Sequence, residues 1–129
     1  MTEISGDGSP AKDCSLYKPI AVSILENNQL LQLYISDQLN QLVRVVFNNN
    51  TIATVAGNGT IEYSDNVPAI NSGLNTPNGI AVSSSGELYI PDNNNNNRIR
   101  KVLTNGIITT IAGNGGDGYS GDGGPAINA

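Results

Sequence analysis

The 129-residue chain lacks histidine entirely and has one cysteine and few charged residues, 13% of the total. Without histidine it cannot build a Ser-His-Asp or Cys-His catalytic site, and we expect no catalytic zinc within it, since histidine commonly holds such a metal. The single cysteine, Cys14, allows no intramolecular disulfide. With no histidine to activate it, its thiol is predicted to be a buried apolar group.

Positive charge is also scarce, because 6 basic residues face 11 acidic ones and the net charge is −5. Such a surface repels phosphate backbones, so we expect no nucleic-acid partner. The chain has no signal peptide and no apolar run near the roughly 18 residues that a membrane span needs, so no membrane partner is expected. If the chain is complete, these features predict a soluble, cytoplasmic protein; the compartment of a longer parent stays open.

What the sequence does contain is a repeat of about 56 residues. TIATVAGNG at 51–59 returns as IITTIAGNG at 107–115, and LYISD at 33–37 returns as LYIPD at 88–92. SGDGSPA at 5–11 likewise matches SGDGGPA at 120–126, two repeats later, so the two ends lie in the same phase. A fixed period of this length indicates a solenoid, a propeller or an array.

Each repeat holds four short apolar runs separated by turn residues. They are 19–23, 31–35, 42–47 and 51–56 in the first copy, and 79–83, 87–90, 98–103 and 107–112 in the second. Asn105-Gly106 between two such runs is a strong hairpin signal. The pattern predicts an all-β fold with two four-stranded antiparallel propeller blades, a partial propeller, and no helix beyond a short turn near 68–74.

Several strings of the second copy resemble the NHL repeat of β-propellers. They are PNGIAV at 77–82, GELYI at 86–90, NRIRKV at 97–102 and ITTIAG at 108–113, and GNGGDGYSGDGGPA at 113–126 resembles the loop of the long variant. The resemblance covers almost the whole chain. It implies an inter-blade loop remnant at 1–18, a blade at 19–57, a loop at 58–78, a blade at 79–113 and the start of another loop at 114–129. It indicates a scaffold, not an activity.

Two acidic patterns could suggest a site. Asp37 and Asp92 each follow the second run and precede an arginine, Arg44 or Arg98. Because they occur once per repeat, a structural role, accepting backbone N–H bonds in a turn, is favoured over a ligand pair. Asp117 and Asp122 lie among glycines, which raises the question of calcium, but the stretch 57–68 of the other copy does not keep the pattern. Turn formation is therefore the better interpretation.

The remaining candidates also favour structure over ligand binding. Arg98 and Arg100 share one strand face while Lys101 points to the other, so no basic patch is expected. Tyr34 and Tyr89 recur at one blade position and are predicted to pack in the core. The asparagine run 93–97 is interpreted as a low-complexity loop insertion. Five recurring glycines are predicted to serve backbone geometry: Gly57, Gly59, Gly106, Gly113 and Gly115.

We therefore predict no catalytic, cofactor-binding or metal-binding residue in the chain, and no cofactor. The leading hypothesis is a non-catalytic scaffold, a segment of a larger propeller, that binds an unidentified protein partner. The alternative is a fragment of a propeller enzyme, a metal-dependent hydrolase or lyase, with its active-site residues outside this chain; glycan binding by the loops is a third hypothesis. If the chain is complete, two blades cannot close a ring, and three copies arranged head to tail would give six blades.

Overall fold

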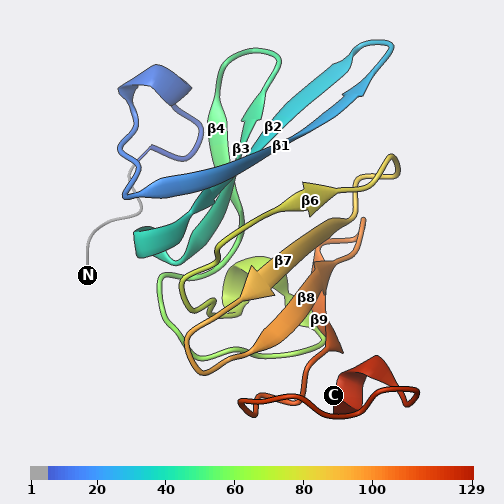
Figure 1. The fold of residues 1–129 in the computed structure, drawn as a ribbon. Helices are drawn as coiled ribbons and strands as arrows, with labels where there is room; N and C mark the ends of the chain where they lie inside the picture. The colour runs from blue at the N-terminus through green and yellow to red at the C-terminus, as the bar shows by residue number, and fades with distance from the viewer. Residues whose placement is uncertain (1–5) are drawn as a thin grey trace.

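The computed structural model describes residues 6–129, so residues 1–5 of the predicted 1–18 segment lie outside the described part. Two antiparallel sheets are stacked on each other (Figure 1). The first sheet contains, in order, β1 (Pro19–Asn27), β2 (Leu30–Asp37), β3 (Leu42–Phe47) and β4 (Ile52–Ala56). The second contains, from one edge, β5 (Val67–Pro68), β9 (Ile107–Ala112), β8 (Arg98–Val102), β7 (Leu88–Asp92) and β6 (Ala81–Val82). The predicted all-β, blade-like fold is confirmed.

The second sheet has one strand more than predicted. The added strand, β5, comes from the segment between the blades and pairs with β9 through Val67↔Ile108 and Pro68↔Ile107. The first sheet has a weaker counterpart, a single bridge between Pro10 and Thr51. In both repeats, therefore, the segment that precedes a blade is attached along that blade's fourth strand.

Helical structure in residues 6–129 consists of short 3-10 turns. The predicted turn near 68–74 is confirmed at Ala69–Asn71. Three further turns, at Ala11–Asp13, Gln38–Asn40 and Ala126–Asn128, were not predicted. Across the described residues, none of the helices is long and apolar enough to cross a membrane.

The core lies between the two sheets. Side chains of β2 and β3, including Tyr34 and Val43, pack with Leu88 and Ile90 of β7, and Leu74 of the connecting segment joins them. Burial of Tyr34 confirms the core prediction for that residue.

Tyr89, the second predicted core tyrosine, is only half-buried. It alternates with Leu88 and Ile90 along β7, so its ring lies on the opposite face of the second sheet. There the ammonium of Lys101 lies 5.4 Å from the ring centroid. The equivalence of the two tyrosines thus holds for their position in the repeat and not for their surroundings.

The outer face of β1 is apolar and open. Ile20, Val22 and Ile24 are exposed to 42%, 62% and 57%. The alternate residues face the second sheet, where Ser23 Oγ accepts a hydrogen bond of 3.2 Å from the backbone N–H of Val82. The first sheet therefore has a packed inner face and an uncovered outer one.

The five predicted glycines have positive φ, which confirms their role in backbone geometry. Two of them also lie close to the backbone of a neighbouring segment. A Cβ at Gly57 would lie 2.2 Å from the carbonyl oxygen of Gln41, and one at Gly113 would lie 2.3 Å from that of Asn97. At these two positions both the conformation and the close approach require glycine.

Candidate interaction site

Arg44 on β3 is the centre of a buried charge cluster in the first repeat. Its Nη2 donates to Asp7 Oδ1 at 2.7 Å, its Nη1 lies 3.7 Å from Asp37 Oδ2, and the side chain is 1% exposed. Asp37 also accepts from the backbone N–H of Tyr17 at 2.7 Å, and Asp7 accepts from that of Thr54 at 3.0 Å. The arginine thereby connects the lead-in loop, the second strand and the fourth strand.

Arg100 on β8 repeats this arrangement. Its Nη2 donates to Asp65 Oδ1 at 3.0 Å, its Nη1 donates to Asp92 Oδ2 at 3.3 Å, and the side chain is fully buried. Asp92 accepts from the backbone N–H of Asn75 at 2.6 Å, and Asp65 accepts from the hydroxyl of Thr110 at 3.0 Å. Both clusters have the same role, because each attaches an incoming loop to a blade by charge-assisted hydrogen bonds.

These contacts correct two sequence interpretations. The partner of Asp92 is Arg100 and not Arg98. The strand register places Arg98 opposite Asp92, but the Arg98 guanidinium donates to the carbonyls of Asn96 and Asn114 instead. The asparagine run is also more than an insertion. Asn96 is 8% exposed, and its side-chain amide donates to Asp92 Oδ2 at 2.9 Å, as Asn40 donates to Asp37 in the first repeat at 2.8 Å.

The electrostatics of the Arg100 cluster are dominated by burial. Loss of solvent raises the pKa of the Asp92 carboxyl above its usual value of 3.8. The hydrogen bonds from Asn75 and Asn96 and the charge of Arg100 act in the opposite direction and lower it. The carboxylate of Asp92 has a structural role, since its oxygens accept hydrogen bonds from Asn75, Asn96 and Arg100.

Arg98, the first residue of β8, contacts the loop that follows β9. Its guanidinium donates to the carbonyls of Asn96 at 2.6 Å and Asn114 at 3.0 Å, and it stacks on the Tyr63 ring with Cζ 4.1 Å from the centroid. Arg100 approaches the same ring at 5.1 Å. Tyr63, which the sequence reasoning did not single out, therefore links the connecting segment to both arginines.

The segment between the blades fills a slot beside Gly57. The backbone N–H of Gly73 donates to the carbonyl of Glu62 at 2.9 Å, and that of Leu74 donates to Thr60 at 3.1 Å. Leu74 is completely buried. A Cβ at Gly73 would lie 2.4 Å from the Glu62 oxygen, so glycine is required for this fit.

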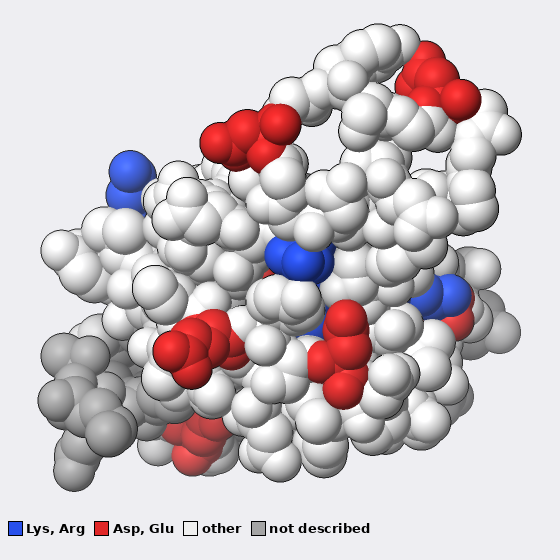
Figure 2. Space-filling model, turned by 90° about the horizontal axis from the view of Figure 1, so that it is seen from below, with Lys and Arg blue, Asp and Glu red and all other residues white. Residues whose placement is uncertain are grey.

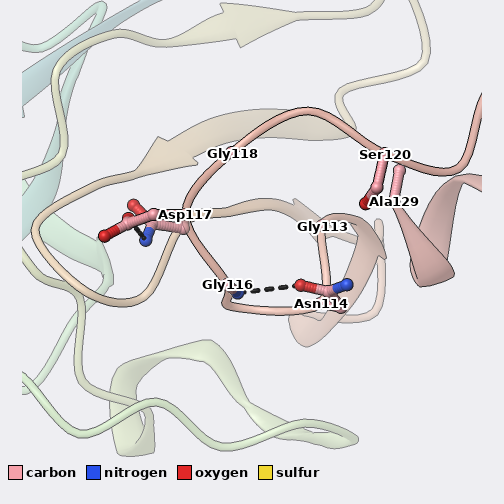
Figure 3. Close-up of a pocket in the computed structure, with 8 residues that line it drawn as sticks. Gly113, Asn114, Gly116, Asp117, Gly118, Ser120 and Ala129 are labelled. Atoms are coloured by element: carbon pink, nitrogen blue, oxygen red, sulfur yellow. Dashed lines mark hydrogen bonds between the residues drawn. The ribbon is translucent and has the colours of Figure 1, made fainter.

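The same slot recurs beside Gly113, where none of the described residues fills it. This pocket has a volume of about 410 Å³ and is formed mainly by the C-terminal loop. Figure 3 shows its lining residues. Asn97, Gly116 and Gly118 stand where Gln41, Thr60 and Glu62 stand one repeat earlier. The pocket is lined by Asn97, Gly113, Asn114, Gly116, Asp117, Gly118, Ser120 and Ala129. We call it the C-terminal slot.

The other predicted residues are placed as follows. Cys14 is only half-buried, with its thiol donating to the carbonyl of Gly6 at 3.3 Å, so the expected buried apolar thiol is wrong. The reason is that a polar loop surrounds it. Asp117 accepts from the Asn97 amide at 2.7 Å, and Asp122 accepts from the Tyr119 hydroxyl. Within residues 6–129, no group of three or more Asp, Glu, Cys or His side chains is placed to hold a metal ion.

Charged side chains are dispersed over the face shown in Figure 2. Lys and Arg side chains there are few and separated from each other, with Asp and Glu groups between them. One basic residue of β8, Lys101, is neutralised locally by an ion pair of 2.9 Å with Glu87. This face presents no continuous region of one sign.

Comparison with known proteins shows similarity to the teneurins. Residues 61–120 match the model of the teneurin NHL domain. The chain is 35% identical over 95 residues to Teneurin-3 of Mus musculus, in a match that covers 72% of this chain and 3% of that protein. It is 33% identical to Teneurin-1 of Mus musculus in a match covering 85% of this chain and 4% of that protein. The chain thus spans a few hundredths of the length of these curated relatives.

A solved structure shares the fold. A protein of unknown function from Bacteroides thetaiotaomicron aligns with a TM-score of 0.58 at 17% identity, over 75% of this chain and 36% of that one. This likeness concerns the fold alone. Together with the family match, it confirms the predicted class: the chain folds as NHL-like propeller blades, and residues 61–120 are similar to the teneurin NHL domain.

Proposed function

We propose that this chain is a non-catalytic binding scaffold, a segment of a larger NHL-type propeller that presents its loops to a protein partner. The observation that carries the proposal is the use made of its charged groups. In both repeats the arginine of the third strand and two aspartates are bound to each other and to backbone groups. These side chains stabilise the blades and are not poised to act on a substrate.

The relationship to the teneurin NHL domain supports the same proposal. The exposed surface adds to it, since Leu30 and Leu31 lie exposed at the hairpin between β1 and β2, where a protein surface could cover them. A Leu30→Asp, Leu31→Asp double variant should retain the fold, because both side chains are exposed. It should lose a partner that binds through this hairpin.

The experiment is affinity capture from the source cells with the wild type, this double variant and a Lys12→Asp control at an exposed position away from β1. A partner that binds the wild type and the control directly, and does not bind the double variant, supports the scaffold. The alternative of an enzyme fragment is tested in the full-length parent. Stoichiometric metal together with hydrolase or lyase activity that requires this segment's side chains would contradict the proposal.

A further inference from the structure

We propose that Asn58 is a self-modification site, at which the backbone nitrogen of Gly59 attacks the side-chain amide and converts the asparagine to aspartate and isoaspartate. The site lies in the segment that joins the two blades, and the inference does not depend on the proposed scaffold function. Asn-Gly pairs are prone to this reaction because glycine has no side chain to obstruct the attack. The chain has four such pairs: Asn58-Gly59, Asn78-Gly79, Asn105-Gly106 and Asn114-Gly115.

The reaction needs only water as a co-reactant. A base removes the proton from the backbone N–H of Gly59, and the nitrogen forms a bond to Cγ of Asn58. The bond from Cγ to Nδ2 breaks, and Nδ2 takes up a proton and leaves as ammonia. Water then opens the cyclic succinimide at either carbonyl, which gives aspartate or isoaspartate. The net change is hydrolysis of the side-chain amide to a carboxylic acid and ammonia.

The surroundings of Asn58 favour the attack. Its Oδ1 accepts hydrogen bonds from the backbone N–H of Thr60 at 2.9 Å and from the Thr60 hydroxyl at 2.7 Å. Negative charge develops on this oxygen as Gly59 attacks, and donors already aimed at it stabilise that charge. The N–H of Gly59 has no acceptor within residues 6–129, so its nitrogen is available. All three residues are exposed, which admits water and base.

The equivalent pair one repeat later lacks both advantages. Gly116 stands where Thr60 does, so among the described residues Oδ1 of Asn114 accepts only a backbone N–H, at 2.8 Å. The Arg98 guanidinium donates to the Asn114 carbonyl at 3.0 Å, and its Nη1 would lie 2.5 Å from a Cβ at Gly115. Arg98 thereby restrains the peptide group that has to turn for the attack.

Two further pairs are held by the second sheet. In the hairpin of β8 and β9, the backbone N–H of Gly106 donates to the carbonyl of Leu103 at 2.9 Å, so the attacking nitrogen is engaged. Asn78 is attached to β7, because its backbone N–H donates to the carbonyl of Pro91 at 3.4 Å. Asn58 is therefore expected to react first.

The isoaspartate product lengthens a stretch of backbone whose two ends are fixed. Gly57 donates its backbone N–H to the carbonyl of Ala69 at 3.0 Å. Leu74 donates to the carbonyl of Thr60 at 3.1 Å. Isoaspartate inserts an extra carbon atom into the main chain between these hydrogen bonds. Both products also lose Nδ2, which reaches the carbonyl of Asn71 at 3.3 Å. We expect the reaction to loosen the connecting segment from the first blade.

The test follows each asparagine while the full chain is incubated at neutral pH, by peptide mapping with mass spectrometry and enzymatic methylation of isoaspartate. Asn58 should be converted at least about threefold faster than Asn105 or Asn114. Thr60→Val, which removes the hydroxyl and keeps the backbone N–H, should slow conversion of Asn58 by about threefold. A rate at Asn58 no higher than at the other two, or no effect of Thr60→Val, would overturn the proposal.

The second repeat allows a matched exchange. Arg98→Leu introduces the residue that the first repeat has at Leu42. Gly116→Thr supplies the hydroxyl of Thr60. The double variant should convert Asn114 about threefold faster than the wild type does, and an unchanged rate would contradict the proposal.

A urea-unfolded sample keeps the test decisive where a variant does not fold. In urea the four pairs should react at similar rates, because only the folded chain positions Thr60 and Arg98. If Asn58 remains the fastest site in urea by the same factor, local sequence and not the fold sets its rate, and the proposal fails.

Amide hydrogen exchange tests the consequence. In the chain enriched in isoaspartate at position 58, the amides of Gly73 and Leu74 should exchange about tenfold faster than in the fresh chain, as the loss of a hydrogen bond implies. Asn58→Asp, which keeps the normal backbone, should show a smaller increase. Unchanged exchange in the isoaspartate form would contradict the release of the connecting segment.

Discussion

The segments 15–19 and 73–77 have nearly the same backbone in two different surroundings. Both run into the first strand of a blade, and both donate a backbone N–H to the aspartate that ends that blade's second strand. Leu74 has a preceding loop to pack against and is fully buried, whereas Leu16 is left 37% exposed. The comparison teaches that a blade sets the conformation of its own lead-in segment. Burial of that segment requires the loop of the blade before it.

The largest expected effect comes from the buried arginines, which the two repeats share. Arg100→Met should lower the free energy of unfolding by about 3–5 kcal/mol, because it leaves the Asp92 carboxylate buried without its charge partner. The loss of unfolding free energy for Arg44→Met should lie in the same range, since Asp37 is equally buried. Urea unfolding measures both. A large loss in only one repeat would break their equivalence.

Replacing Leu74 or Leu16 should destabilise the chain to different extents and so distinguish segment 73–77 from segment 15–19. Leu74→Ala is expected to cost about 2–5 kcal/mol, because it empties space in the core between the sheets. Leu16→Ala should cost no more than about 0.5 kcal/mol in the monomeric chain, as for surface substitutions in general. The difference between the two unfolding free energies is the measurement. Equal losses would show that Leu16 is buried in solution by a contact the single chain lacks.

Glycines give a smaller and more local comparison. Gly106→Ala should cost about 1–2 kcal/mol, because its φ of 83° is strained for alanine while its surroundings are open. Gly113→Ala should cost clearly more, because its Cβ would also collide with the carbonyl of Asn97. Thermal unfolding of the two variants tests the order. A smaller loss at Gly113 would mean that the approach of residues 97 and 113 is looser than described.

The smallest expected effect is on the pH dependence of stability. Because burial raises the pKa of Asp92 in the folded state, the stability contribution from its titration is fully present below its unfolded pKa. That contribution is lost as pH rises through the folded value. The unfolding free energy of the wild type minus that of Asp92→Asn should therefore decrease as pH is raised from about 3 to 7.

The control for the pH series is Gln29→Ala, at an exposed position without an ionisable side chain. The difference in unfolding free energy between the wild type and this control should not change with pH. An increase with pH at position 92 would show that Arg100 and the amide donors outweigh burial.

Much of the fold could be predicted from local pattern. Short apolar runs broken by Asn-Gly and glycine turns are enough to predict strands, and the repeat is enough to align Arg44 with Arg100. The β-bulges, which shift the strand register between β3 and β4 and between β8 and β9, were not predictable in this way. Val43 pairs with Ala56 and Arg44 with Thr54, and the second repeat has the same shift between Ile99 and Arg100. A change of register depends on the pairing of two strands, which neither strand's sequence reports alone.

The charge clusters were also only partly predictable from the sequence. The repeated aspartates were visible in the sequence, but the hydrogen bonds from Arg44 to Asp7 and from Arg100 to Asp65 join residues 35 or more positions apart. Asn96 was hidden in the asparagine run, and a comparison with Asn40 one repeat earlier was the signal that could have found it. Tyr63 recurs as Tyr119, but this recurrence does not reveal its role, because that role depends on two arginines brought over its ring.

The sequence by itself determined the repeat, the strands and the positions that require glycine, because strand alternation and turn conformation are local properties of a few residues. Tertiary structure decided which arginine meets which aspartate, which of two equivalent tyrosines is buried, and which of two equivalent slots is filled. Those outcomes depend on a neighbouring blade being present to exclude water. Similar local sequences therefore differ in stability according to whether a neighbouring blade covers them.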